Sequence, residues 1–175
     1  QVTELVHIRP NSRVVVIGAG KLGMLTAQVL KLTGADLSVV VRHDYQAQLL
    51  ANWGIRAVHF DELPQRRAEV VVDCTGVAQG FADSLDLVAP RGTIVLKSTY
   101  HGLPQADLTR VAVDEIRIVG NRCGPFAAAL RLMQAGLVEL DSMVEARYSL
   151  DDGIAAFEHA DRKGVMKVLL DIAVR

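Results

Sequence analysis

The stretch Val14-Val15-Val16-Ile17-Gly18-Ala19-Gly20-Lys21-Leu22-Gly23 decides the fold of this chain. Its β-branched run predicts a buried strand over residues 13–17, and its glycines follow in the pattern G-x-G-x-x-G where a helix begins. The first glycine permits a tight turn, the second lets a pyrophosphate approach the backbone, and the third lets the helix pack closely on the sheet. An anion in such a turn binds the free N–H groups at the positive end of the helix. The stretch therefore predicts a dinucleotide site at Gly18, Ala19, Gly20, Lys21, Leu22 and Gly23, with a glycine turn that holds no ligand as the alternative.

Beyond this stretch, short β-branched runs alternate with segments of helical length. We predict strands at residues 13–17, 37–41, 56–59, 69–73, 93–97 and 115–119, a helix N-capped by Asp44, and a turn at 89–92. This pattern indicates an α/β fold, a doubly wound parallel six-stranded Rossmann sheet with strand order 3-2-1-4-5-6. Helices at 125–135 and 149–160 and strands at 143–148 and 165–170 would add a short C-terminal αβαβ tail.

Length and composition favour one globular domain, residues 1–175, with 50% hydrophobic and 22% charged residues. The 19 Lys and Arg residues against 20 Asp and Glu residues give a net charge of −1, without the basic excess of nucleic-acid-binding proteins. No apolar run of about 18 residues and no signal peptide is present. We therefore expect a cytoplasmic protein with no nucleic-acid or membrane partner. The cysteines and histidines have no metal-ligand spacing, so we expect no metal site in this chain.

The residue at the end of the second predicted strand bears on the choice of cofactor. NAD-binding domains usually place an acidic residue there, on the ribose diol, whereas this chain has Arg42, followed by His43. A guanidinium forks onto phosphate oxygens, so this pair favours the 2′-phosphate of NADP. Asp44 could still turn toward a ribose, and an arginine in a loop can be a solvated surface charge. We expect an NAD(P) cofactor, with NADP preferred over NAD.

Three further predicted strand ends should contribute to the same edge of the sheet, because ligands of open parallel sheets bind beyond the carboxyl ends of the strands. These are residues 74–76, 98–100 and 120–122, which are rich in small and polar side chains that are also ordinary in loops. The chain has no Tyr-x-x-x-Lys pair, no G-x-S-x-G elbow and no GxxxxGK[ST] loop. These absences argue against a short-chain dehydrogenase, an α/β-hydrolase and a P-loop enzyme.

The order of these signals resembles the cofactor-binding half of medium-chain, zinc-dependent alcohol dehydrogenases. The resemblance rests on residues 14–23, 71–76, 91–95, 148–151 and 167–170 and spans nearly the whole chain. Residues 118–125, IVGNRCGP, are similar to the branch that includes polyol and threonine dehydrogenases.

The resemblance implies roles for single positions. Residues 18–23 would hold the pyrophosphate, Arg42 would occupy the adenosine-ribose position, and Thr75 would lie near that ribose. Ser98 and Thr99 would border the nicotinamide, and Lys167 would approach the pyrophosphate unless it is a plain solvated lysine. The resemblance also implies a preceding GroES-like domain that carries the catalytic zinc.

Nothing in this chain resembles that domain, so we expect a fragment, beginning at Gln1, that binds cofactor without catalysing hydride transfer. Strands 143–148 and 165–170 should then lack partners, since in the family they return to the missing domain. The strand at 115–119 should lie at the sheet edge and pair across a homodimer axis. A stand-alone NAD(H)-sensing regulatory module is the alternative function.

Overall fold

The structure is a computed structural model, and it describes residues 1–100 and 102–172. The chain forms two compact units, Gln1–Val138 and Glu139–Arg175. Each unit is a separate body. The helix predicted at 125–135 belongs to the first unit, and the rest of the predicted tail, from residue 143 onward, falls within the second.

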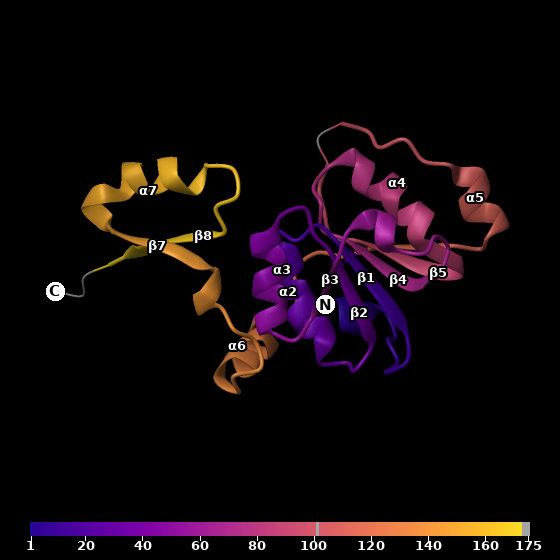
Figure 1. Ribbon diagram of the computed structural model, residues 1–175, viewed down its shortest axis with the longest axis horizontal. Helices are drawn as coiled ribbons and strands as arrows, with labels where there is room; N and C mark the ends of the chain where they lie inside the picture. Colours follow the sequence, from indigo (N-terminus) through magenta and orange to yellow (C-terminus); the bar gives the residue numbers. More distant parts are fainter. Residues whose placement is uncertain (101, 173–175) are drawn as a thin grey trace. The chain divides into compact units, whose positions relative to one another are not determined.

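The first unit is built on a six-stranded parallel sheet (Figure 1). The strand order is β3-β2-β1-β4-β5-β6, which confirms the order predicted from the sequence. The strands are β1 (Arg13–Ile17), β2 (Asp36–Val40), β3 (Arg56–Val58), β4 (Ala68–Asp73), β5 (Val88–Leu96) and β6 (Arg117–Gly120).

Both faces of the central strands are buried, which is why their sequences are continuous apolar runs. Val15 and Ile17 of β1 pack in one cluster with Phe81 and Leu85 of α4 (Ala78–Leu87). The alternate residues point to the other face, toward α2 (Lys21–Lys31) and α3 (Asp44–Asn52). Helices therefore cover both sides of the sheet, as Figure 1 shows.

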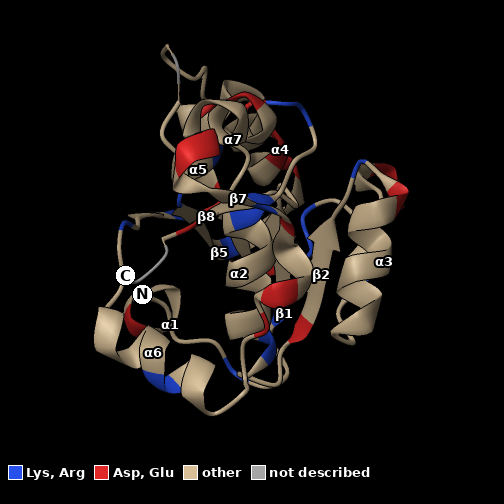
Figure 2. Cartoon of the chain, turned by 90° about the vertical axis from the view of Figure 1, so that its left-hand side faces the viewer, with Lys and Arg blue, Asp and Glu red and all other residues tan. Residues whose placement is uncertain are grey.

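The remaining elements of the first unit are short. They are α1 (Val2–Leu5), the 3₁₀ turn η1 (Phe60–Glu62), α5 (Leu108–Val113) and α6 (Phe126–Gln134). Between β3 and β4 the chain forms only the single 3₁₀ turn η1. Lys, Arg, Asp and Glu residues are interspersed over the elements seen in Figure 2, in keeping with the near-zero net charge.

Two local predictions were wrong. The predicted turn at 89–92 is a bulge inside β5: Ala68 pairs with Val88, and the next partners are Val70 and Thr93. The extra residues are accommodated because Arg91 takes a positive φ of 63°. Asp44 is the first residue of α3 rather than its N-cap, because the chain turns one residue earlier, at His43.

The second unit is a parallel βαβ structure. It contains η2 (Asp141–Met143), β7 (Val144–Ser149), η3 (Leu150–Asp152), α7 (Gly153–Ala160) and β8 (Lys167–Asp171). Ser149 accepts a hydrogen bond from the Asp152 amide and so caps η3, which leads into α7. The expectation that the last two strands lack partners was wrong, because β7 and β8 pair with each other.

Candidate functional site

The glycine turn between β1 and α2 is held by close backbone packing. Gly18 has a φ of +95°, and a Cβ there would lie 2.9 Å from backbone atoms of Cys74 and Thr75. A Cβ at Gly23 would lie 1.8 Å from the Gly18 carbonyl oxygen. A Cβ at Gly20 would meet nothing within 4 Å. The fold therefore requires glycine at 18 and 23, whereas the space above Gly20 is open to a molecule from outside the chain.

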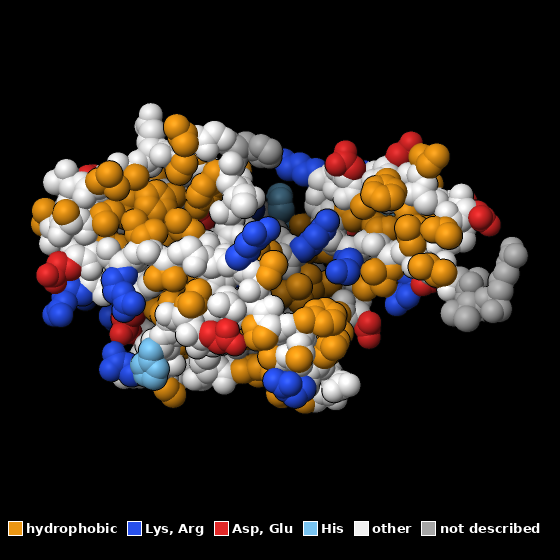
Figure 3. Space-filling view, turned by 180° about the vertical axis from the view of Figure 1, so that it is seen from behind, with side chains coloured by type: hydrophobic (Ala, Val, Ile, Leu, Met, Phe, Trp, Pro, Cys, Tyr) orange, Lys and Arg blue, Asp and Glu red, His pale blue; other side chains and the backbone are white. Residues whose placement is uncertain are grey.

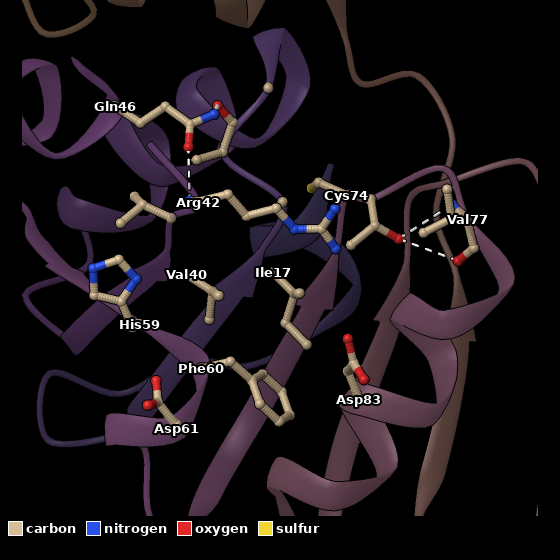
Figure 4. Close-up of a pocket in the computed structure, with 15 residues that line it drawn as sticks. Ile17, Val40, Arg42, Gln46, His59, Phe60, Asp61, Cys74, Val77 and Asp83 are labelled. Atoms are coloured by element: carbon tan, nitrogen blue, oxygen red, sulfur yellow. Dashed lines mark hydrogen bonds between the residues drawn. The ribbon is translucent and has the colours of Figure 1, made fainter. Parts of the chain in front are cut away.

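A pocket of about 530 Å³ opens beside this turn, beyond the carboxyl ends of β1 to β4 (Figure 4). Figure 4 shows Arg42 extending into it, with His59, Phe60 and Asp61 along one side and Asp83 of α4 on another. The residues that line the pocket are Ile17, Gly18, Ala19, Gly20, Val40, Val41, Arg42, Gln46, His59, Phe60, Asp61, Cys74, Thr75, Val77 and Asp83. The pocket thus joins an apolar floor of strand residues to a rim that carries both signs of charge.

Gln46 ties the end of β2 to the glycine turn. Its side chain is buried, its Oε1 accepts from the amides of Arg42 (2.9 Å) and His43 (3.2 Å), and its Nε2 donates to the Ala19 carbonyl at 3.0 Å. The backbone around Arg42 is therefore fixed, while the guanidinium remains exposed to solvent.

A second network joins the ends of β4 and β5. The fully buried Asp73 carboxylate accepts from the Thr75 amide and hydroxyl, both at 2.8 Å, and from the Tyr100 hydroxyl. Ser98 accepts from the Gly76 amide at 2.8 Å and donates to the Asp73 carbonyl. These bonds place Thr75 on the wall of the pocket.

Two side chains at this edge have strongly shifted pKa values, and both are held in their neutral forms. Burial raises the pKa of the Cys74 thiol to about 12. Burial, and then the hydrogen bond to Asp73, raises the pKa of Tyr100 above its ordinary value. Neither group is therefore poised to act as a nucleophile or a general base near neutral pH.

The predicted site residues divide into three groups. Gly18, Ala19, Gly20, Arg42 and Thr75 come together around the pocket. Other predicted residues lie close in the fold without lining it: Gly23 packs under the turn, Lys21 and Leu22 are exposed at the start of α2, His43 precedes α3, Ser98 holds the Gly76 loop, and Thr99 is exposed. Lys167 is the exposed first residue of β8, in the second unit, so its predicted role stays a prediction.

The sequence analysis missed several lining residues: Gln46, His59, Phe60, Asp61, Val77 and Asp83. A signal was available for three of them, because residues 59–61 directly follow β3 and the rule on strand ends applies there as well. Gln46 and Asp83 lie within helices, and only the folded contacts bring them to the pocket.

Within residues 1–100 and 102–172, no group of three or more His, Cys, Asp or Glu side chains could hold a metal ion. The donors needed for zinc do not come together in this part of the chain, so no chemical step is assigned to a metal here. Over the same residues, no helix is both long enough and apolar enough to cross a membrane.

Comparisons with known proteins agree with this geometry. A family model described as zinc-binding dehydrogenase matches residues 22–135. D-arabinitol dehydrogenase 1 of Uromyces fabae is 28% identical over 95% of this chain and 52% of its own length. Sorbitol dehydrogenase of Gallus gallus is 27% identical over 91% of this chain and 49% of its own length.

A solved structure shows the same architecture. A Sinorhizobium meliloti 1021 protein, named as a zinc-binding dehydrogenase and crystallised with NADP, superposes with a TM-score of 0.85 at 26% identity. The match covers 96% of this chain and 54% of that one. The chain thus spans about half the length of the relatives it matches.

Proposed function

Because this chain belongs to the zinc-binding dehydrogenase family, we propose that it binds a nicotinamide dinucleotide and orients it for hydride transfer to or from an alcohol or polyol carbon. The observation that carries this proposal is the glycine turn. Gly18 and Gly23 are demanded by packing inside the protein, but the open space above Gly20 serves no internal contact. A pyrophosphate is the group that this turn would accept, on the N–H groups that begin α2.

The rest of the cofactor would follow the strand ends in both directions from the turn. The adenosine half would enter the pocket, with Thr75 near the ribose. Ser98 and Thr99 would border the nicotinamide, which accepts or supplies the hydride when bound. The structure of the Sinorhizobium meliloti protein, which was crystallised with NADP, supports this assignment.

We further propose that NADP is preferred over NAD. Arg42 lies just beyond the end of β2 and lines the pocket. Its exposed guanidinium can donate two hydrogen bonds to a 2′-phosphate. Asp61 and Asp83 belong to the same pocket, and their carboxylates would repel that phosphate, so we place it on the Arg42 side.

Calorimetry with NADH and NADPH tests the cofactor proposals. We expect the chain to bind both and to prefer NADPH, and we expect Arg42→Asp to reverse the preference, because a carboxylate accepts a ribose diol and repels a phosphate. The matched control is Arg56→Asp, an exposed arginine at the amino end of β3 that does not line the pocket, and it should change nothing. Absence of binding to either cofactor would overturn the proposed function, and an unchanged preference in Arg42→Asp would remove Arg42 from the site.

Catalysis, in this proposal, needs more than the residues of this chain, since its relatives are about twice as long. We expect no oxidation of sorbitol or other alcohols by the chain alone, measured by NADH or NADPH absorbance. Measurable turnover would refute this part of the proposal and leave cofactor binding intact.

We also propose a homodimer through β6. This strand pairs with β5 on one side and has no second neighbour among the described strands. Exposed apolar side chains lie on β6 and in the segment before it, namely Leu108, Val113 and Ile118, and hydrophobic side chains gather on the face shown in Figure 3. An edge with free backbone groups and apolar surroundings favours pairing with a second copy. Light scattering that reports a monomer well above micromolar concentration would contradict it.

A further inference from the structure

A cluster of hydrogen-bond donors lies at the carboxyl ends of β5 and β6, outside the pocket described above. Leu96 ends β5, Gly120 ends β6, and the two residues are paired. The residue that follows β5 is Lys97, and the residue that follows β6 is Asn121. The Lys97 ammonium donates to the Asn121 side-chain oxygen and, at 2.9 Å, to the Arg122 carbonyl. Lys97 is half-buried, and Arg122, which follows Asn121 in the sequence, is exposed.

This cluster carries positive charge without a counter-charge. Neither Lys97 nor Arg122 forms an ion pair with a carboxylate of the described residues. The backbone carbonyl of Asp73 accepts a hydrogen bond from the Lys97 amide. The Asp73 carboxylate accepts hydrogen bonds from Thr75 and Tyr100 instead. A half-buried ammonium that contacts only neutral oxygens is an unusual arrangement, because buried charges are normally paired.

The Asn121 side chain shows the same shortage of acceptors. It is only 8% exposed, and its oxygen is taken by Lys97, which leaves the buried Nδ2 without a partner among the described residues. A buried donor without an acceptor calls for an explanation such as an absent water or ion. Two independent observations, the uncompensated charge and the unpartnered amide, therefore point to a missing acceptor.

The position of the cluster indicates that it would contact the reacting half of a bound dinucleotide, or the substrate, rather than the adenosine half. The pocket extends from the glycine turn over β1 to β4 and does not include Lys97, Asn121 or Arg122. Lys97 instead follows β5, the neighbour of β4 on the side away from β1. With the adenosine half over the pocket, the reacting half of a dinucleotide and its substrate would extend over β5 and β6.

We propose that Lys97 and Arg122 form a subsite for an oxyanion of the substrate, a carboxylate or a phosphate, next to the carbon that exchanges hydride. This inference rests on the proposed function and narrows it, because it assigns acidic substrates such as hydroxy acids rather than neutral polyols. The pyrophosphate of the cofactor is the other oxyanion that the same cationic cluster could contact. The test must therefore distinguish binding of a substrate carboxylate or phosphate from binding of the cofactor pyrophosphate.

The test uses two probes that differ in one terminal group, D-gluconate and D-glucitol, titrated into the chain with and without saturating NADH and followed by NMR. With NADH bound, we expect gluconate to bind at least about tenfold more tightly than glucitol, a difference of about 1.4 kcal/mol. Lys97→Met should abolish this preference while leaving NADH binding unchanged, and Lys97→Arg, which keeps the charge, should retain it. Lys163→Met, an exposed lysine of the second unit, is the matched control and should behave as the unmodified chain.

Equal binding of the two probes, or an unchanged preference in Lys97→Met, would overturn the proposal. Displacement of gluconate by NADH would also overturn it, because the subsite would then belong to the cofactor. Failure of NADH to bind at all would instead refute the proposed function, which separates the two failures. The fluorescence of Trp53, the only tryptophan, reports whether each variant is folded.

Discussion

The contrast between Gly20 and Gly23 is the sharpest test of how the glycine turn works. The two residues are three positions apart in one motif, yet an added methyl group meets very different surroundings at each. We expect Gly23→Ala to destabilise the fold, and Gly20→Ala to leave the fold intact while losing cofactor binding.

The magnitudes follow from the contacts. At Gly23, a Cβ 1.8 Å from a backbone oxygen forces α2 away from the sheet, which places the cost at the upper end of overpacking, about 3 kcal/mol or more. Alanine regains about 1 kcal/mol of helix propensity, so the net loss in the free energy of unfolding is about 2 kcal/mol or more. At Gly20, whose φ of −84° suits alanine and whose Cβ has free space, we expect a change within about 0.5 kcal/mol.

Urea unfolding followed by Trp53 fluorescence measures stability, because Trp53 directly follows α3 in the first unit. Calorimetry with NADH measures binding, and we expect Gly20→Ala to weaken it by at least about tenfold, or about 1.4 kcal/mol, since a methyl group occupies the space of the pyrophosphate. If Gly20→Ala is as unstable as Gly23→Ala, or binds NADH as the unmodified chain does, the assignment of that open space to a ligand is wrong.

Two further predictions concern the shifted pKa values. Because folding raises the pKa of Tyr100, its phenol stabilises the fold fully below about pH 10, where the unfolded side chain begins to ionise, and less above it. The difference in unfolding free energy between the unmodified chain and Tyr100→Phe, measured in urea, should therefore be constant up to that pH and then narrow; a difference that widens would contradict the assignment. A thiol reagent at about pH 8 should modify the exposed Cys123 rapidly and Cys74 only after unfolding, because burial keeps the Cys74 thiol protonated. Mass spectrometry of the modified chain would decide this, and equal modification of both cysteines in the folded protein would show that Cys74 is accessible.

Sequence reasoning succeeded where the physical signal is local. The strand, glycine turn and helix of residues 13–31 were predicted because each residue's role depends on its immediate neighbours. The strand order followed from the handedness and spacing of βαβ connections, which are general rules.

It failed where long-range contacts decide the outcome. Residues 89–92 contain Pro90 and Gly92 and resemble a turn, but the pairing of Val88 with Ala68 keeps them within β5. Likewise, no residue near β7 in the sequence indicates that β7 pairs with β8, because η3 and α7 separate the two strands along the chain. At the site, Gln46 was missed because its three hydrogen bonds reach groups that only the fold brings near.

The anchoring of Gln46 has a practical consequence for protein engineering. Its hydrogen bonds hold the main chain before α3 through backbone groups alone, so no part of the scaffold depends on which side chain stands at position 42. Single replacements at position 42 can therefore change the cofactor preference of the pocket while the surrounding backbone stays in place. A library confined to residue 42 should yield variants that remain folded and differ only in the phosphate or diol that they select.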